Sequence, residues 1–291
     1  DLYLGLNRGF YGSSLSTKLF GACGKGSCGC STSSHEKSNE NDINLKLKAM
    51  NYDIIQSIEN GEYEDGLEIS DLYLEAIKGN YSEEHSYYQS ALNNKAFILK
   101  MMGKLEEAKQ IFEKVLSNYL ANKNIENEKI IIVKQNIATL LRDMKKNDQA
   151  IKIFEDLFNM LKTNRINPST EANIYISASG CYRALKQYKI CEELLKKAEV
   201  IVEQNYGESN LPLSNIYNQY GICAKDQGNF EESLNFYMKS LKIKESILEK
   251  AHPEILKTRQ NLAQLYIEMG KRDKALELLN ETDQIIKDNK I

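Results

Sequence analysis

The residues best suited to chemistry lie near the N-terminus, where three cysteines and a histidine follow the spacing Cys23-x4-Cys28-x-Cys30-x4-His35. Three thiolates and one imidazole can close tetrahedrally on zinc, and a Gly-rich segment can fold around the ion. Plant-type iron–sulfur proteins open with a similar Cys-x4-Cys but need two residues before the third cysteine, where this chain has one. The favoured interpretation is a flexible tail with three free thiols and no cofactor. A metal site is the alternative, with zinc ahead of an iron–sulfur cluster.

No other group of residues forms a catalytic pattern. The sequence has no GxxxxGK[ST], no GxGxxG opening a helix, no HExxH and no GxSxG. Its three histidines, His35, His85 and His252, are not paired with a nucleophile by any sequence feature. His252 is best interpreted as a linker residue. The chain is therefore predicted not to be an enzyme.

Composition argues against several other classes of protein. Of 291 residues, 42% are hydrophobic and 27% charged, which is ordinary for a well-cored protein. A net charge of −3 with interspersed signs gives no basic face for nucleic acid. No apolar run approaches the ~18–20 residues that span a bilayer. Three prolines and 16 glycines are few for the turns of a β-rich fold.

A repeat of about 42 residues organises most of the chain. Similar segments such as GKLEEA and GNFEES recur, and the spacings of the residues that open them are 42, 42, 41, 42 and 42. The opening residues are Gly61, Gly103, Lys145, Lys186, Gly228 and Gly270. A fixed period of this length indicates stacked supersecondary units, with a turn at each of these positions.

Small and large residues recur around each turn. Five residues after it stand the small residues Gly66, Ala108, Ala150, Cys191, Ser233 and Ala275. Seven residues before it stand Ile54, Ala96, Ala138, Ser179, Gly221 and Ala263. Nine residues after it stand Ser70, Phe112, Phe154, Leu195, Tyr237 and Leu279. Small residues let two helices approach closely, and large ones fill the space beside them, so each repeat is predicted to be an αα-hairpin.

The pattern predicts an all-α protein. Apolar residues recur at three- and four-residue steps in segments such as LEEAKQIFEKVL. We expect residues 43–291 to form about twelve helices in six hairpins, and residues 1–42, which hold seven glycines, to form an irregular arm. Pro168, Pro212 and Pro253 all fall between repeats, where helix continuity is not needed.

The last repeat, NLAQLYIEMGKRDKALELL, resembles the tetratricopeptide repeat consensus at Leu262, Ala263, Tyr266, Gly270 and Ala275. That family usually has 34 residues per repeat. The run ILEKAHPEILKTRQNLAQLY is similar to the longer repeats of kinesin light chains, in its His-Pro linker and its Asn-Leu-Ala. The resemblance covers about residues 43–291. It implies a right-handed superhelical solenoid whose first helix in each repeat lines a concave groove.

The resemblance also implies a role for paired amides on these first helices. They are Asn93, Asn94, Gln135, Asn136, Asn218, Gln219, Gln260 and Asn261. Kinesin light chains look similar at this level, and there such amides bind the backbone of an extended peptide. An amide suits this because it offers a donor and an acceptor without charge. The alternative is that one amide of each pair makes a hydrogen bond between repeats.

A cation recurs at one level of four consecutive repeats, as Lys100, Arg142, Arg183 and Lys225, at spacings of 42, 41 and 42. One interpretation is a basic stripe that receives acidic side chains of a partner peptide. The other is pairing with Asp143, Asp226 or acidic groups of neighbouring helices.

Two functions fit a scaffold of this kind. The first is a structural or assembly subunit of a larger complex, with its arm held by other chains. The second is a cytoplasmic adaptor of kinesin-light-chain type that binds short peptide motifs. Kinesin light chains also carry an N-terminal heptad coiled coil, which this sequence lacks, and this favours the first.

The expected compartment is the mitochondrion. From Leu2 to His35 there are three basic residues, Arg8, Lys18 and Lys25, no acidic ones, and many Ser and Gly, as in organellar transit segments. The stretch RGFYGS beginning at Arg8 resembles a site read by mitochondrial presequence peptidases. The cytoplasm is the alternative.

Overall fold

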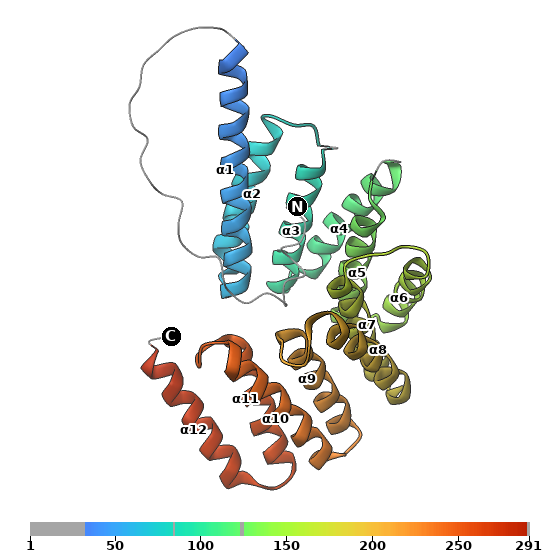
Figure 1. Ribbon diagram of the computed structural model, residues 1–291, viewed down its shortest axis with the longest axis vertical. Coiled ribbons are helices and arrows are strands. Elements are labelled where there is room, and N and C mark those ends of the chain that lie inside the picture. The colour runs from blue at the N-terminus through green and yellow to red at the C-terminus, as the bar shows by residue number, and fades with distance from the viewer. Residues whose placement is uncertain (1–32, 84, 123–124, 290–291) are drawn as a thin grey trace. The chain divides into compact units, whose positions relative to one another are not determined.

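The computed structural model describes residues 33–83, 85–122 and 125–289, and these contain twelve α-helices and no strand (Figure 1). The helices are α1 (Ser33–Asn60), α2 (Tyr63–Lys78), α3 (Ser86–Met101), α4 (Leu105–Ala121), α5 (Asn127–Asp143), α6 (Asn147–Leu161), α7 (Pro168–Ala184), α8 (Tyr188–Tyr206), α9 (Leu211–Asp226), α10 (Phe230–Ile247), α11 (Pro253–Glu268) and α12 (Arg272–Asp288). The predicted all-α fold is confirmed. Among the described helices, none combines the length and the apolar character needed to cross a membrane.

The six predicted turn positions all lie between the two helices of a hairpin, and all six have a left-handed backbone. The φ angles of the four glycines run from 74° to 81°, and those of Lys145 and Lys186 are 63° and 59°. In this conformation the backbone N–H groups after the helix reach back to its last carbonyls: Gly103 donates to Lys100 and Lys104 donates to Leu99. The repeat register is therefore right, and two lysines occupy a conformation that favours glycine.

The first helices of later hairpins begin with built-in start signals. The three prolines lie in the first turns of α7, α9 and α11, where their missing N–H costs nothing. The preceding residues cap these helices: the Asn210 side chain accepts from the Leu213 amide at 2.8 Å, and His252 Nδ1 accepts from the Glu254 amide at 3.2 Å. His252 therefore stabilises a helix start, which agrees with its interpretation as a linker residue.

Helices α1 to α4 belong to an N-terminal unit that reaches to Glu126. Within it α1 packs on α2, α2 on α3, and α3 on α4. Helix α1 begins at Ser33, ten residues before the expected boundary at residue 43, because residues 33–60 contain no glycine or proline to stop a helix. The rest of the expected irregular arm, residues 1–32, lies outside the described residues.

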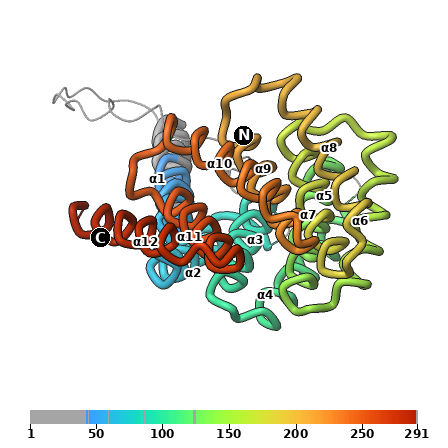
Figure 2. The backbone as a smooth tube through the Cα atoms, turned by 90° about the horizontal axis from the view of Figure 1, so that it is seen from below, coloured from blue at the N-terminus to red at the C-terminus, as the bar shows by residue number. Residues whose placement is uncertain are grey.

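Helices α5 to α12 belong to a C-terminal unit that starts at Asn127. Each helix packs on its neighbour in the chain, and in addition α5 contacts α7 and α7 contacts α9 (Figure 2). The first helices of successive hairpins therefore lie side by side. Their common surface, on α5, α7, α9 and α11, is called the inner face below.

The size pattern around the turns explains how each hairpin closes. In the fifth hairpin a Cβ added to Gly221 would lie 2.6 Å from a ring carbon of Tyr237, so only glycine fits there. In the first hairpin the sizes are exchanged: Ile54 lies on the first helix and Ser70 on the second, and both are fully buried. In the sixth hairpin, Leu279 was expected to fill core space but is 41% exposed, since no further hairpin covers α12 among the described residues.

Candidate peptide-binding surface

Amides of the first helices join neighbouring hairpins. In the C-terminal unit Asn261 Nδ2 donates to Asn218 Oδ1 at 3.0 Å, and Gln135 Nε2 donates to Ser177 Oγ at 3.4 Å. In the N-terminal unit Asn94 Nδ2 donates to Asn51 Oδ1 at 3.1 Å. Each bond, called a rung below, links a residue to the one 42 or 43 positions further on. For these residues the structure agrees with the second interpretation, hydrogen bonding between repeats.

Two of the expected amides are left over from this ladder. The side-chain amides of Gln219 on α9 and Gln260 on α11 make no hydrogen bond within the part of the chain that the structure describes. Gln219 is half-buried and Gln260 is exposed. By the spacing of the rungs, the residue on α7 that would pair with Gln219 is Ile176, and its side chain has no polar group. Both side chains therefore keep a free donor and a free acceptor, the pair of groups that a peptide backbone needs.

The remaining expected amides are less accessible. Asn93 is 3% exposed, and Asn136 is half-buried; both take part in interactions. Groups that are already satisfied gain little from a ligand, because binding exchanges one hydrogen bond for another. The surface available for backbone recognition thus narrows to α9 and α11.

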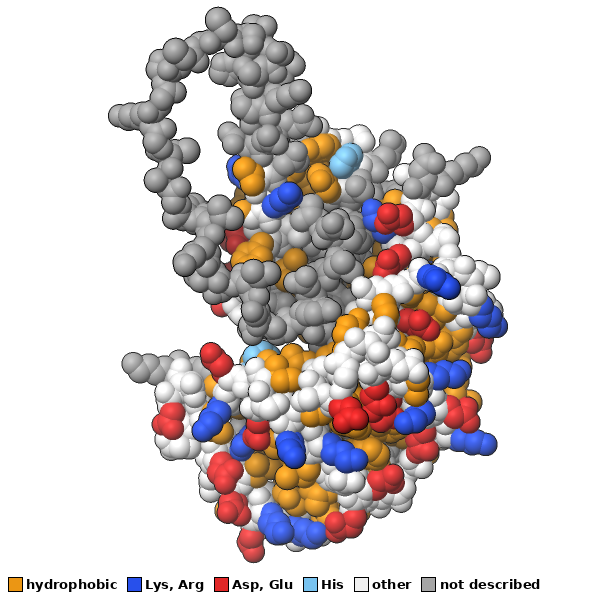
Figure 3. Space-filling model, viewed as in Figure 1, with side chains coloured by type: hydrophobic (Ala, Val, Ile, Leu, Met, Phe, Trp, Pro, Cys, Tyr) orange, Lys and Arg blue, Asp and Glu red, His pale blue; other side chains and the backbone are white. Residues whose placement is uncertain are grey.

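The cation ladder consists of ion pairs. Arg183 Nη1 bonds to Asp226 Oδ2 at 2.5 Å, and Lys225 Nζ bonds to Glu268 Oε1 at 3.3 Å, both 43 residues further on. Charged side chains of both signs are interspersed over the face of the C-terminal unit seen in Figure 3. The cations of α7 and α9 therefore join hairpins, and the structure agrees with the second interpretation given for them.

Two cations depart from this pattern. Arg142 has Ala184 where the next hairpin would supply an acid, so it bonds to the adjacent Asp143 at 3.1 Å and lies against Gly180. Lys100 Nζ lies 5.7 Å from the ring centroid of Phe97. None of the four is an isolated positive charge, so the stripe has less attraction for an acidic partner than its sequence spacing suggested.

Apolar side chains on the inner face were not singled out as site residues. Ile222 is half-buried on α9, and Ile267 on α11 is 46% exposed. They lie on the same helices as the two free amides. The sequence pattern already distinguished Ile267, because four other repeats have a cation at this position. The two amides offer hydrogen bonds to a peptide backbone, and the two isoleucines offer an apolar contact to one of its side chains.

The candidate metal ligands Cys23, Cys28, Cys30 and the side chain of His35 lie outside the described residues. Elsewhere in the described chain, no three potential ligands gather around one point. The described cysteines are buried, and burial raises the pKa of Cys181 to about 11, so this thiol stays protonated and unreactive at neutral pH.

A stack of helical hairpins, joined by polar rungs along its first helices, defines a helical-repeat scaffold for protein interaction. The tetratricopeptide repeat family model matches residues 87–163, 170–246 and 212–282. The chain therefore belongs to the tetratricopeptide repeat family, which confirms the resemblance inferred from its repeats.

The relatives agree with the kinesin-light-chain character of the repeats. The chain is 24% identical over 208 residues to Protein KINESIN LIGHT CHAIN-RELATED 2 of Arabidopsis thaliana, covering 71% of this chain and 31% of that protein. Protein KINESIN LIGHT CHAIN-RELATED 3 of the same plant is also 24% identical, over 207 residues, which is 71% of this chain and 32% of that protein. The chain thus spans about a third of the length of these curated relatives.

Solved structures share the fold at low sequence identity. The Rap protein complexed with Competence and Sporulation Factor has a TM-score of 0.69 at 12% identity, covering 88% of this chain and 70% of that one. BtubC (BKLC) from P. vanneervenii has a TM-score of 0.59 at 14% identity, covering 85% and 92%. Bacillus thuringiensis PlcR, in complex with the peptide PapR7 and DNA, has a TM-score of 0.55 at 15% identity, covering 71% and 75%.

Proposed function

We propose that this chain is a non-enzymatic scaffold that binds an extended peptide across α9 and α11. The observation that carries the proposal is the pair of free amides, Gln219 and Gln260, on a surface where neighbouring amides bond to each other. A bound strand would accept and donate through these amides and place an apolar side chain against Ile222 and Ile267. Two structural neighbours, the Rap protein and PlcR, were solved with a factor or peptide bound, and this supports a peptide as the ligand class.

The ligand is expected to be recognised more by its backbone than by its charge. The inner-face cations Arg183 and Lys225 already have carboxylate partners, so an acidic peptide would have to displace Asp226 or Glu268. Such an exchange gains little at half-exposed sites. Binding should therefore depend only weakly on salt.

The experiment is selection of binders from a random peptide library displayed on phage, followed by affinity measurement with two double variants. Gln219→Ala with Gln260→Ala should lower the affinity of selected peptides at least tenfold and leave the Tm unchanged, since neither amide supports the fold. Asn218→Ala with Asn261→Ala is the matched control: it removes a rung and should lower the Tm instead. Selected peptides that bind the first variant as tightly as the unaltered chain would overturn the proposal.

The cellular role we propose is that of an adaptor of kinesin-light-chain type. Its support is the similarity to two kinesin-light-chain-related proteins and the 42-residue repeats. A structural or assembly subunit of a mitochondrial complex is the second candidate, because residues 2–35 contain basic residues and no acidic ones.

Imaging separates the two roles. The chain fused at its C-terminus to a fluorescent protein should be diffuse in the cytoplasm for an adaptor. Mitochondrial signal that is lost when Arg8, Lys18 and Lys25 are changed together to Ala would favour the second role and reject the first.

A further inference from the structure

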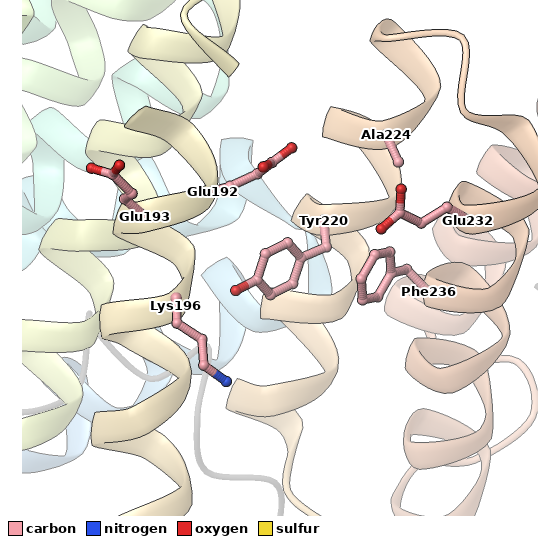
Figure 4. A pocket seen from close by; sticks show the side chains of 7 residues that line it. All are labelled: Glu192, Glu193, Lys196, Tyr220, Ala224, Glu232 and Phe236. Atoms are coloured by element: carbon pink, nitrogen blue, oxygen red, sulfur yellow. The ribbon is translucent and has the colours of Figure 1, made fainter. Parts of the chain in front are cut away.

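A second concave site lies on the side of α9 opposite the inner face. Asn218, Ile222 and Lys225 share one side of this helix, at steps of four and three residues, whereas Tyr220 and Ala224 share the other. There α8, α9 and α10 enclose an open pocket of about 340 Å³ (Figure 4). This outer pocket is separate from the proposed peptide surface.

An aromatic wall with a fixed position forms one side of the outer pocket. The rings of Tyr220 and Phe236 are stacked, with centroids 4.9 Å apart and planes at 18°. The hydroxyl of Tyr220 donates to Glu199 Oε2 at 3.4 Å, and Lys196 Nζ donates to the same oxygen at 2.7 Å. The wall is therefore held before any ligand arrives, and its ordering costs no entropy on binding.

The rim of the pocket carries uncompensated negative charge. The carboxylates of Glu193 and Glu232 make no hydrogen bond or ion pair with any described residue. Glu192 accepts from the neutral amide of Gln227 at 2.7 Å, so its charge remains. The one cation in the lining, Lys196, is matched by Glu199, which is 9% exposed. In Figure 4 the side chains of Glu192 and Glu232 lie toward the aromatic wall, whereas Glu193 points away from it. Two carboxylates beside an aromatic wall are complementary to a cation that has a flat or apolar surface.

Within the chain, a cation already lies near Phe236 and its neighbour Tyr217. Lys239 Nζ lies 5.7 Å from the centroid of Phe236 and 5.5 Å from that of Tyr217. An ammonium or guanidinium over an aromatic face is attracted by the ring quadrupole. Of the two cationic side chains, arginine fits better, because its planar guanidinium stacks on a ring and bonds to carboxylates through several N–H groups at once.

We propose that the outer pocket binds an arginine side chain of a protein partner, stacked against the Tyr220 ring and bonded to Glu192 and Glu232. The partner would reach the scaffold from the side opposite to the inner face. One chain could then hold two segments at once, a peptide along α9 and α11 and an arginine-bearing segment between α8 and α10. Different substitutions abolish binding at the two sites, so the proposal for one site can be rejected while the other stands.

The test is an NMR titration of the isotope-labelled full chain with Nα-acetyl-arginine amide. The control probe is Nα-acetyl-citrulline amide, which has nearly the same shape and no charge. Arginine at millimolar concentration should shift signals of residues in α8, α9 and α10 around Tyr220, whereas citrulline should shift them at least tenfold less. In Glu192→Gln with Glu232→Gln, the arginine response should fall at least tenfold while the circular dichroism spectrum is unchanged.

A matched control variant is Glu106→Gln with Glu107→Gln, which removes two acidic residues from the first turn of α4. It should respond to arginine as the unaltered chain does. Equal shifts by arginine and citrulline, shifts that map to residues outside the pocket, or an undiminished response in the Glu192/Glu232 variant would each overturn the proposal.

Discussion

The first and fifth hairpins solve the same packing problem in opposite ways. In the fifth, the first helix contributes Gly221 and the second contributes Tyr237, whose ring leaves no room for a Cβ on its partner. In the first, the corresponding residues are Ile54 and Ser70, and both are completely buried. The large residue has moved from the second helix to the first. What a helical hairpin conserves here is the combined volume at one level, and either helix can supply it.

A second exchange separates the same two hairpins. Sixteen residues after its turn the first hairpin has Ile77, which is fully buried, and the fifth has Lys244, which is 2% exposed. The ammonium of Lys244 bonds to Glu254 Oε2 at 2.8 Å and Thr258 Oγ1 at 3.1 Å on α11. The fifth hairpin is thus tied to the sixth by charge, where the first hairpin uses an apolar side chain.

The largest effect should come from removing the filling residue of the fifth hairpin. Tyr237→Ala empties the space beside Gly221 and should destabilise the C-terminal unit by about 3–5 kcal/mol. Ser70→Ala, at the same level of the first hairpin, removes one hydroxyl and should cost under about 1 kcal/mol. Denaturant unfolding measures both. Equal losses of unfolding free energy in the two variants would show that the exchange of large and small residues does not determine stability.

The next effect comes from adding a methyl group where the structure leaves no space. Gly221→Ala places a Cβ 2.6 Å from the Tyr237 ring, and overpacking of this kind costs about 1–3 kcal/mol. Gly66→Ala in the first hairpin meets Ser57 Cβ at 3.1 Å and should cost less, since small shifts relieve that contact. Amide hydrogen exchange of α9 and α10, compared with α2, gives the local loss in each case. Faster exchange in α2 than in α9 would reverse the comparison.

A gain in stability is expected at the two non-glycine turns. Lys145→Gly and Lys186→Gly relieve a left-handed backbone that costs a non-glycine residue about 1 kcal/mol. Each should raise the Tm, whereas the reverse change Gly228→Lys should lower it by a similar amount. Thermal unfolding followed by circular dichroism is sufficient, and a lower Tm for both lysine variants would contradict the expectation.

The smallest effect is a dependence on pH that arises from the ion pair between Lys244 of the fifth hairpin and Glu254 of the sixth. Burial alone would raise the pKa of Glu254, but the ammonium of Lys244, which also donates a hydrogen bond, lowers it below its ordinary value. This interaction therefore stabilises the fold above about pH 4.5, the unfolded value, and is lost as the pH falls through the lower folded pKa. The Tm difference between the unaltered chain and Glu254→Gln should be clear at pH 7 and should shrink as the pH falls below 4.5. Ser70→Ala should show no such change with pH.

Local and periodic features could be predicted from the sequence. Spacing alone placed turns at Lys145 and Lys186, although neither is a glycine, because a repeat constrains every copy at once. The start of α1 was missed, since a polar segment without glycine or proline is compatible with both helix and arm. The state of the inner-face residues also needed the structure: whether Gln219 is free depends on Ile176 in the preceding hairpin. The partner of Arg183 likewise depends on which residue lies opposite it.

The ion pair between hairpins at Arg183 has a consequence for how such a chain can change in length. Arg183 bonds to a residue 43 positions on, and that residue belongs to whichever hairpin comes next. Deleting residues 211–252, which contain α9 and α10 entirely, would bring Glu268 to the distance along the chain that Asp226 now has. The charge pair would survive, and the matched residues Gly221 and Tyr237 would leave together. Cutting within the hairpin would instead set Ser179 against Tyr237. The fifth hairpin can therefore be removed as a whole module, because its fit is decided inside it and the sixth hairpin also supplies an acid for Arg183.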